Sequence, residues 1–361
     1  MKSLNQNNST VALIEIGGSH DECLLSQLVA LRTSGCKVVL VCNDEIQKRN
    51  PHFNDWVDEW ILVDFCSKAW KDFMIVRKMM RDIKKTGAKT IVFNTAQGGI
   101  VRNAVLLNLF SKTHFVGIIH TLRKFQGSTT QKIIFWKVKR YLLLSEYLLE
   151  QAKTDGLEVD YFYPLRFPSS ELPDKSPLSS LNITLIGGVE NRRKDLAGFI
   201  HLIQADNNAN FTFLGKSDPE KEEVITFKKE LEASGLSERV TLYDSFVSHD
   251  EFNKVLDSTD AILPLIHPKS PSAAQYFKNQ IAGAMTISFS YKIPMLLHEE
   301  YEHIKEMKAA SIYYSNETFE SAIERLFSHK ETIFQQMSAH PAYQVEVQEK
   351  RYLDFVLDYE K

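Results

Sequence analysis

The sequence lacks any long hydrophobic run. No stretch among its 361 residues reaches the roughly 18 consecutive apolar residues that a membrane-spanning helix requires. Its first residues, MKSLNQNNST, are polar and lead directly into a strand-like run, without the hydrophobic region of a secretory signal peptide. The sequence therefore predicts a cytoplasmic protein with an ordinary globular composition.

Cysteine is scarce, and motifs for metal binding are missing. The four cysteines are Cys23, Cys36, Cys42 and Cys66. None of them forms a Cys-x-x-Cys pair, and they lie in apolar or helical contexts, which predicts buried free thiols instead of a disulfide framework or a metal site. The histidines show no metal-ligand spacing, and no Asp-x-Asp motif is present. We expect no bound metal.

Two nucleotide-related classes are disfavoured by further absences. No Gly-x-Gly-x-x-Gly run is followed by an acidic residue at the distance that dinucleotide-binding dehydrogenases require. The basic segments lack the stacking aromatic residues and the motifs of nucleic-acid-binding modules. We therefore expect neither a dehydrogenase nor a nucleic-acid partner.

Charge is distributed unevenly along the chain. Residues 1–165 hold 22 Lys and Arg against 16 Asp and Glu, whereas residues 166–361 hold 21 against 30. A basic N-terminal half suits an anionic partner, such as a lipid-linked acceptor or a membrane surface, although ordinary solvated helix surfaces explain the same excess.

Short apolar runs alternate with helical periodicity through the first half. The predicted strands are Val11–Ile16, Cys36–Cys42, Trp60–Val63, Thr90–Phe93, Phe115–Ile119 and Tyr141–Leu144. Helices are predicted between them, the clearest at 68–85, 100–110 and 133–139. Such alternation indicates a parallel sheet covered by helices, in which buried strands are almost wholly apolar.

A segment rich in proline and serine, 163–180, then interrupts the pattern, and the alternation resumes after it. In the second half, strands are predicted at 183–186, 211–214, 240–242, 261–263 and 294–297, and helices at 195–205, 219–234, 249–258, 282–291, 300–309, 317–329 and 344–359. The sequence thus predicts an α/β protein with an N-terminal domain at 1–165, a linker at 166–180 and a C-terminal domain at 181–343. Helix 344–359 is a candidate to complete the N-terminal domain.

The centre of the chain carries a strand, a glycine turn and a helix in succession. Strand 183–186 ends at Gly187-Gly188, and helical periodicity begins after Arg192, Arg193 and Lys194. A glycine turn lets backbone N–H groups approach an anion, and the following helix N-terminus and three cations add positive charge. This arrangement suits a pyrophosphate, although a glycine pair and a basic loop are also common in α/β proteins without that function.

Several segments together resemble the GT-B glycosyltransferases, and among them glycosyltransferase family 4. The similar segments are YLLLSEYLLEQAKTDGLEVDYFYP, LIGGVENRRKDLAGFIHLI, FTFLGKSD, LSERVTLYDSFVSHDEFNKVLDSTDAILPL and SYKIPMLL, in the family's order. The resemblance covers nearly the whole chain. It implies two Rossmann-like, doubly wound domains facing across a cleft, and a metal-independent transferase of hexosyltransferase type.

The resemblance also assigns residues to a UDP- or GDP-linked sugar donor. Gly188 and Lys194 match the family's glycine and diphosphate-binding lysine, and Arg192 or Arg193 would replace an arginine that is Val189 here. Further donor-binding residues implied by the match are Gly17 and Gly18 at the phosphates and Phe246 and Val247 at the nucleobase. Independently of the match, Gly283 and Ala284 lie at the N-terminus of the helix predicted at 282–291, where backbone N–H groups can bind a phosphate. Small residues at 282–284 equally suit close helix packing.

The match fails at the family's two glutamates. Asn279 and Ile287 occupy the places of the residues that handle the sugar and bind the ribose. The donor, the stereochemical outcome and activity itself are therefore open. A catalytically weak relative that binds nucleotides or saccharides, and a nucleotide-sugar epimerase, are the alternatives to a transferase.

Two histidines are the candidate catalytic residues. His20 follows Gly17-Gly18-Ser19 at a strand end and has the residue type of a general base, whereas helix capping by Ser19 or Asp21 would leave it merely exposed. His120 matches the family histidine that reaches the donor sugar. Glu15 within an apolar strand is unusual, and it either lies at the strand end or pairs with a basic residue.

The expected biological setting is bacterial cell-surface polysaccharide synthesis. Segments 68–85 and 132–144 mix basic and apolar residues, a pattern of helices that lie on an anionic membrane and also of helices packed on their own sheet. The predicted partners are a nucleotide sugar and a saccharide or lipid-linked acceptor. A peripheral contact with the inner face of the cell membrane is compatible with them, and no cofactor is expected.

Overall fold

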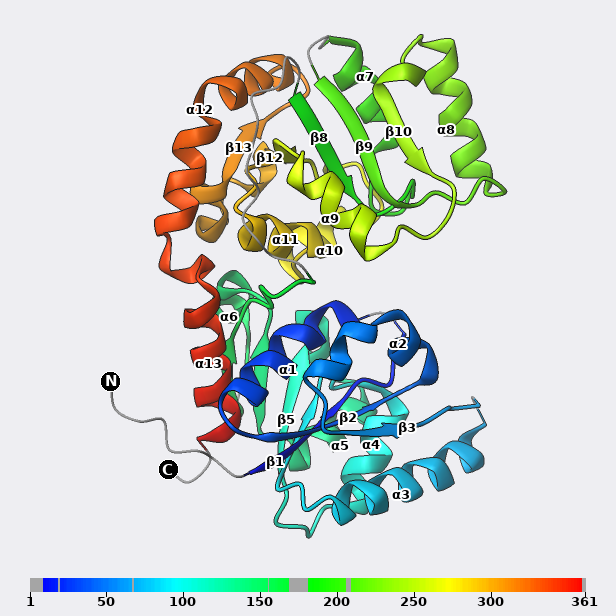
Figure 1. Ribbon diagram of the computed structural model, residues 1–361, viewed down its shortest axis with the longest axis vertical. Helices are drawn as coiled ribbons and strands as arrows, with labels where there is room; N and C mark the ends of the chain where they lie inside the picture. Colours follow the sequence, from blue (N-terminus) through cyan, green and yellow to red (C-terminus); the bar gives the residue numbers. More distant parts are fainter. Residues whose placement is uncertain are drawn as a thin grey trace. The chain divides into compact units, whose positions relative to one another are not determined.

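The computed structural model describes residues 9–18, 20–66, 68–154, 156–168, 181–205 and 209–358. The chain folds into two compact units (Figure 1). The first comprises Met1–Arg166 and Val345–Lys361, and the second comprises Phe167–Gln344. Most of the predicted linker at 166–180 lies outside the described residues.

The first unit contains a parallel sheet built from the predicted apolar runs. Its described strands are β1 (Thr10–Ile14), β2 (Lys37–Cys42), β3 (Glu59–Leu62), β4 (Thr90–Phe93), β5 (His114–Ile119), β6 (Arg140–Leu143) and β7 (Glu158–Tyr161). Their order is β3-β2-β1-β4-β5-β6-β7. The direction of winding reverses between β1 and β4, where Ile14 and Phe93 are partners at the carboxyl ends. Ligands of such sheets bind at this reversal point.

Helices cover both faces of this sheet. They are α1 (Leu24–Thr33), α2 (Asp44–Arg49), α3 (Ala69–Lys85), α4 (Gly98–Leu107), α5 (Thr129–Lys137), α6 (Glu146–Gln151) and the C-terminal α13 (Val345–Leu357). Helices α3, α4 and α5 are successive neighbours in one layer, and α13 packs beside α1 (Figure 1). The C-terminal helix therefore belongs to the first unit.

The second unit repeats the architecture. Its described strands are β8 (Leu181–Ile186), β9 (Ala209–Lys216), β10 (Val240–Tyr243), β11 (Ala261–Ile262), β12 (Met295–His298) and β13 (Ser311–Tyr314), in the order β10-β9-β8-β11-β12-β13. All of these pairings are parallel. The winding reverses between β8 and β11, so the glycine turn after β8 lies at a reversal point.

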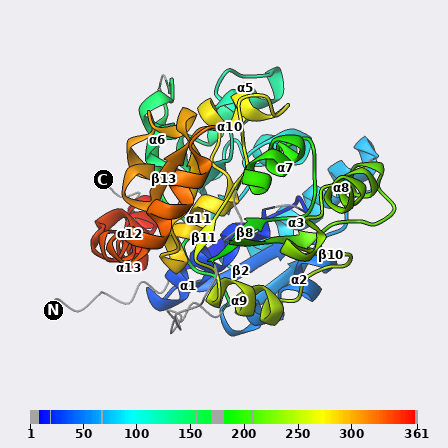
Figure 2. The same cartoon turned by 90° about the horizontal axis from the view of Figure 1, so that it is seen from above.

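The helices of the second unit are α7 (Leu196–Ala205), α8 (Glu222–Ala233), α9 (His249–Asp257), α10 (Ala273–Lys278), α11 (Gly283–Tyr291) and α12 (Phe319–Ala339). Helix α12 lies against β13 (Figure 2). The predicted α/β class with two Rossmann-like domains is thus confirmed.

Several local predictions were wrong or incomplete. Strands β7 and β13 and helices α2 and α10 were not predicted, and each is short. The predicted helix at 300–309 consists instead of two 3-10 segments, Glu299–Tyr301 and Lys305–Ala310. Tyr163, at the start of the proline-rich segment, is buried and donates its backbone N–H to Gln348 on α13, so this part of the segment belongs to the first unit.

The cysteine prediction is correct for three residues. Cys23, Cys36 and Cys42 are free and buried, but Cys66 is exposed because it follows β3 at the unit's edge. In the described part of the chain, no helix combines the length and the apolar character that crossing a bilayer demands.

Candidate functional site

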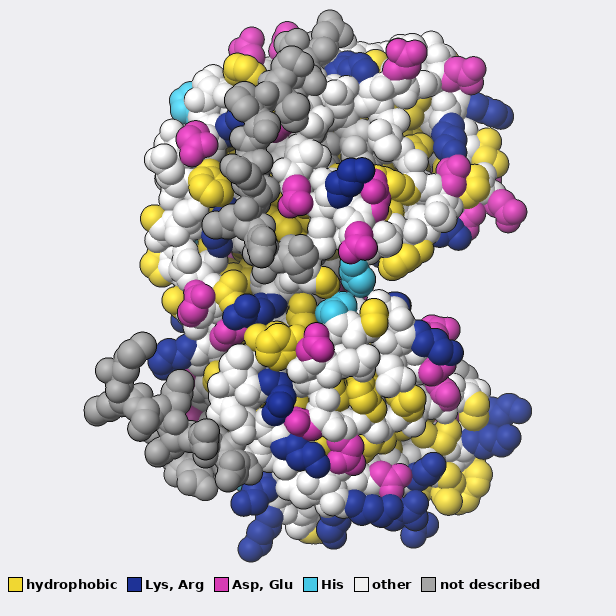
Figure 3. Space-filling model, viewed as in Figure 1, with side chains coloured by type: hydrophobic (Ala, Val, Ile, Leu, Met, Phe, Trp, Pro, Cys, Tyr) yellow, Lys and Arg dark blue, Asp and Glu magenta, His cyan; other side chains and the backbone are white. Residues whose placement is uncertain are grey.

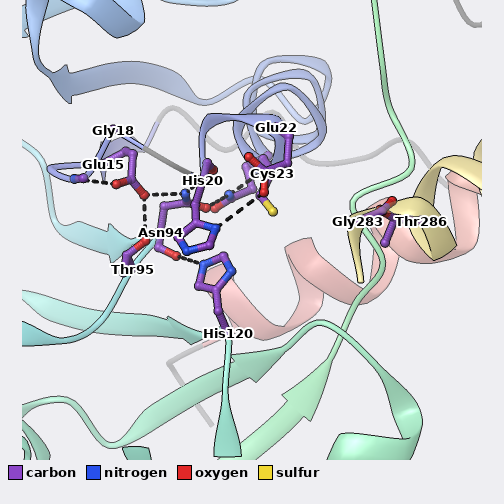
Figure 4. Close-up of polar contacts among 12 residues, drawn as sticks. Glu15, Gly18, His20, Glu22, Cys23, Asn94, Thr95, His120, Gly283 and Thr286 are labelled. Atoms are coloured by element: carbon purple, nitrogen blue, oxygen red, sulfur yellow. Dashed lines mark hydrogen bonds and ion pairs between the residues drawn. The ribbon is translucent and has the colours of Figure 1, made fainter. Parts of the chain in front are cut away.

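The carboxyl end of β1 carries a fully buried carboxylate. Glu15 Oε1 accepts the Gly17 N–H at 2.6 Å, and Oε2 accepts from Asn94 Nδ2 at 2.6 Å and Thr95 Oγ1 at 2.8 Å (Figure 4). Burial raises the pKa of Glu15 above its usual value, and these hydrogen bonds limit the rise. Glu15 therefore lies at the strand end, as the first alternative predicted.

Asn94 connects this loop to the rest of the unit. Its Nδ2 also donates to the His20 carbonyl at 2.8 Å, and its Oδ1 accepts from Gln27 Nε2 on α1 at 2.6 Å. Gln27 Oε1 in turn accepts from the Tyr352 hydroxyl on α13 at 3.1 Å. Because these groups are buried and each has a partner, the network fixes the loop that holds His20.

The two predicted catalytic residues are brought together. The rings of His20 and His120 stack with their centroids 3.9 Å apart and an angle of 20° between their planes (Figure 4). His120 Nε2 lies 2.7 Å from the Asn94 carbonyl oxygen. Since a carbonyl only accepts, Nε2 carries the hydrogen, and Nδ1 of the neutral ring keeps its lone pair.

The two imidazoles differ in basicity. Burial, together with the neighbouring His20, lowers the pKa of His120 to about 3. Burial is the largest single effect on His20 and lowers its pKa as well. The carboxylates of Glu22, 3.4 Å from His20 Nδ1, and of Glu15 and Asp21 together raise it by more, so the pKa of His20 shifts upward overall. At neutral pH, His120 is therefore neutral, and His20 is the stronger proton acceptor of the pair.

The glycines of this loop have different environments. The Gly17 N–H is already bonded to Glu15, whereas a Cβ built on Gly18 would meet no atom within 4 Å among the described residues other than its chain neighbours. Arg49 donates to the Gly18 carbonyl at 2.8 Å and to Asp21 Oδ2 at 2.7 Å. Asp21 thus pairs with Arg49 and does not cap the next helix. Ser19, the other predicted cap, lies outside the described residues.

In the second unit, the glycine turn after β8 packs against the end of β9. A Cβ on Gly188 would lie 1.9 Å from the Lys216 carbonyl oxygen, and one on Gly215 would lie 2.6 Å from the Gly187 Cα. Gly187 has a φ of +85°, which favours glycine. These residues are therefore required by backbone contact, whatever they do for a ligand.

Lys194 is a buried cation. Its side chain is only 5% exposed, and Nζ donates to the Gly188 carbonyl at 3.0 Å. Burial, and secondarily the charge of Arg193, lower the pKa of Lys194 to about 8. Among the described residues, no carboxylate lies within ion-pair distance of Nζ. An arriving phosphate would supply the missing counter-charge.

The neighbouring arginines are not free cations. Arg192 Nε donates to Glu190 Oε1 at 3.0 Å, and Arg193 Nε donates to Glu190 Oε2 at 2.7 Å. Both guanidinium groups lower the pKa of Glu190, although its burial acts in the opposite direction. Glu190 therefore holds the two arginines side by side, and which of them replaces the charge missing at Val189 stays a prediction.

A buried chain of hydrogen bonds next to Lys194 was missed from the sequence. Asp195 Oδ1 accepts the Gly198 N–H at 2.9 Å as the N-cap of α7, and Oδ2 lies 2.9 Å from His267 Nδ1. His267 Nε2 lies 2.8 Å from the Tyr314 hydroxyl. The chain fastens the loop after β11 to α7 and β13. An Asp before a helical run was the available signal for the cap, but its contact with His267 depends on the tertiary fold.

The remaining predicted donor residues are spread along the second unit. Phe246 is 70% exposed, and Val247 beside it is buried. Gly283 and Ala284 begin α11, whose N-cap Ala282 has no side-chain capping hydrogen bond, so the first amides of this helix are not capped by it. In the part of the chain that the structure describes, a Cβ built on Gly283 would meet no atom within 4 Å outside its own helix turn, so close packing does not require glycine there.

The two positions that depart from the glutamate pattern have unlike surroundings. Asn279 ends α10 and is partly exposed, whereas Ile287 is buried in α11. An apolar side chain at Ile287 cannot accept a hydrogen bond from a ribose. In the described part of the chain, no group of three His, Cys, Asp or Glu side chains could hold a metal ion.

Comparison with known proteins identifies the fold. No family model matches the sequence. No curated protein matches it either. A glycosyltransferase from Rickettsia africae ESF-5 superposes with a TM-score of 0.71 at 10% identity, covering 98% of each chain. The chain has the GT-B fold.

Two further solved structures agree with this conclusion. HepE from Anabaena, in complex with UDP and glucose, gives a TM-score of 0.68 at 10% identity over 96% of this chain and 98% of that one. UDP-GlcNAc 2-epimerase from Neisseria meningitidis, bound to UDP-GlcNAc, gives a TM-score of 0.61 at 10% identity, over 97% of this chain and 100% of that one. The predicted resemblance to GT-B proteins is confirmed, and membership of family 4 stays a prediction.

The low pKa of His120 predicts a pH-dependent contribution to stability. Because its folded pKa is below the unfolded value of 6.5, the contribution is complete above pH 6.5 and is lost as the pH falls toward about 3. Gln at this position keeps an N–H donor but does not titrate, so His120→Gln should remove this loss of stability. For one titrating group the free energy of unfolding changes by at most about 1.4 kcal/mol per pH unit. Urea unfolding between pH 8 and 4 measures it.

The matched control is His201→Gln on the exposed face of α7, which should unfold with the pH dependence of the unmodified chain. Parallel stability curves for the unmodified chain and His120→Gln would show that His120 protonates in the folded protein as it does in the unfolded one.

Proposed function

We propose that this protein transfers a sugar from a nucleotide-sugar donor to a saccharide acceptor. The observation that carries the proposal is Lys194, a buried ammonium group beside a glycine turn, with no carboxylate in ion-pair distance among the described residues. In glycosyl transfer from a nucleotide sugar, negative charge grows on the departing diphosphate. A fixed cation near that phosphate stabilises the transition state more than the ground state.

We assign the binding of the nucleoside diphosphate to the second unit. Lys194 would bind the diphosphate together with Arg192 or Arg193, and the uncapped amides at Gly283 and Ala284 add hydrogen-bond donors and the positive end of the α11 dipole. Exposed Phe246 offers a ring face to the nucleobase. UDP in the HepE structure and UDP-GlcNAc in the Neisseria epimerase support a UDP-linked donor.

We assign the deprotonation of the acceptor and the contact with the donor sugar to the first unit. His20, the more basic imidazole, would accept the proton of the attacking hydroxyl, and the neutral His120 would accept a hydrogen bond from a sugar hydroxyl at Nδ1. The network around Glu15 and Asn94 holds both histidines in place. A reaction with such a base proceeds with inversion.

A catalytically weak binding protein is the second candidate. Ile287 and Asn279 favour it, because neither offers the carboxylate that the resemblance requires. Such a protein would bind nucleoside diphosphates and leave every nucleotide sugar intact. An epimerase would instead return an isomeric free nucleotide sugar.

The acceptor is proposed to be a lipid-linked saccharide reached at an anionic membrane in bacterial polysaccharide assembly. Helix α3 carries six Lys and Arg against two Asp, and Trp70 and Met74 are exposed on it. Lys and Arg gather over α3 on the surface of the first unit (Figure 3). A basic helix with exposed apolar side chains suits peripheral contact with anionic lipid.

The role of Lys194 can be tested by ligand-induced thermal shift. UDP, GDP, ADP and their hexose conjugates form the panel, and we expect at least one to raise the unfolding temperature. Lys194→Gln should weaken the binding free energy of that ligand by about 1–3 kcal/mol, the contribution of a charge-assisted phosphate contact. Lys216→Gln, on an exposed lysine of β9, is the control and should leave binding unchanged. Equal loss in both variants would contradict the assignment.

The titration of Lys194 gives a second test. Because its pKa is lowered to about 8, the free protein loses this charge above pH 8, and affinity for the nucleoside diphosphate should fall by up to about ten-fold per pH unit there. Lys194→Arg keeps the charge and should flatten the profile. Calorimetric titration with UDP from pH 7 to 10 measures both, and identical profiles for the two proteins would overturn the prediction.

A further inference from the structure

A cavity of about 470 Å³ lies in the first unit away from the histidine pair. Lys89 and His114, at the amino ends of β4 and β5, are among its lining residues, whereas Asn94 and His120 follow the carboxyl ends of the same two strands. The two sites therefore occupy opposite edges of one sheet, and the proposed sugar chemistry does not use this cavity.

Among the residues that the structure describes, the cavity is lined by cations and by no carboxylate. Lys84 comes from the end of α3, Lys89 precedes β4 and Lys112 precedes β5. Among the described residues, none of these three lysines has an ion pair. The nearby Asp82 does not line the cavity, and it pairs with Lys85 at 2.7 Å. The positive charge of the three lysines is thus left for a ligand.

The rest of the lining is part polar and part apolar. Asn108, Ser111 and Thr113 supply amide and hydroxyl groups, while Met80 and Ile83 supply apolar surface from α3. Side chains of this kind bind an anion through hydrogen bonds and also contact an uncharged part of the same molecule.

A fourth cation, Lys137, contacts a residue that lines the cavity. Lys137 Nζ donates to the Ser111 carbonyl at 2.6 Å, and burial lowers the pKa of Lys137. Phe110, in the turn that leads to Ser111, is fully exposed, and Leu107 at the end of α4 is 38% exposed. An apolar surface therefore adjoins the cationic cavity.

We infer that this cavity binds a phosphate-bearing ligand whose phosphate is held by Lys84, Lys89 and Lys112. Phosphate matches the three lysines because it carries up to two charges and several acceptor oxygens. The ligand comes either from a lipid headgroup, with Phe110 and Leu107 in the lipid, or from a soluble phosphate ester. This inference does not rest on the proposed glycosyl transfer.

The test removes the charge of the cavity and measures binding. The full chain and the variant Lys84→Gln/Lys89→Gln/Lys112→Gln are titrated with inorganic pyrophosphate, and with vesicles of phosphatidylcholine alone or with one-fifth phosphatidic acid. Lys221→Gln/Lys229→Gln/Lys254→Gln, three exposed lysines of the second unit, is the charge-matched control. Binding is measured by the protection of segments 80–91 and 108–114 from hydrogen exchange, so that pyrophosphate bound at Lys194 in the second unit does not contribute.

We expect the cavity variant to bind one of the two anionic probes at least about ten-fold more weakly, with protection of both segments lost, while the control variant behaves as the unmodified chain. A soluble source is indicated if pyrophosphate binds and Phe110→Ser has no effect. A lipid source is indicated if the protein binds only the vesicles that contain phosphatidic acid and Phe110→Ser weakens this binding. The inference is overturned if neither probe protects these segments, or if both triple variants lose binding equally.

Discussion

A buried carboxylate that must be hydrogen-bonded organises the first unit. Glu15 stands where β1 ends, shielded from water, and it remains there because Asn94, Thr95 and the Gly17 amide surround both of its oxygens. Asn94 also holds His20 and His120 through their backbone and ring contacts. The polar ends of two neighbouring strands thus become a rigid support for a pair of imidazoles with opposite pKa shifts.

At the carboxyl-end edge of the second unit's sheet, a close backbone contact takes the place of the buried carboxylate. Its glycine turn touches the backbone at the end of β9, and Lys194 lies buried beside it with the Gly188 carbonyl as its hydrogen-bond acceptor. Asp195, the next residue, is fixed by the α7 amides and by His267. A cation held this firmly is preorganised for a phosphate, and preorganisation is what electrostatic catalysis requires.

The sequence was sufficient for the fold, because parallel strands are continuous apolar runs, whereas the roles of the site residues stay predictions. Glu15 and His20 could be chosen because ligand-binding residues follow strand ends, and His120 could be chosen from the family resemblance. The pairing of Asp195 with His267 could not, since 72 residues separate them and only the sheet order brings them together. Strand β13 was missed because its four residues, Ser311–Tyr314, include a single aliphatic side chain and so do not form the apolar run by which the other short strands were predicted.

The most direct test of the account is the fate of the bond between sugar and diphosphate. The full chain is incubated with UDP- and GDP-hexoses, with water as the only acceptor, and the products are separated by mass and by chromatography. The account predicts slow release of a nucleoside diphosphate and free hexose from at least one donor, abolished by His20→Ala. Donors that remain intact, or that are converted only into isomeric nucleotide sugars, would contradict it.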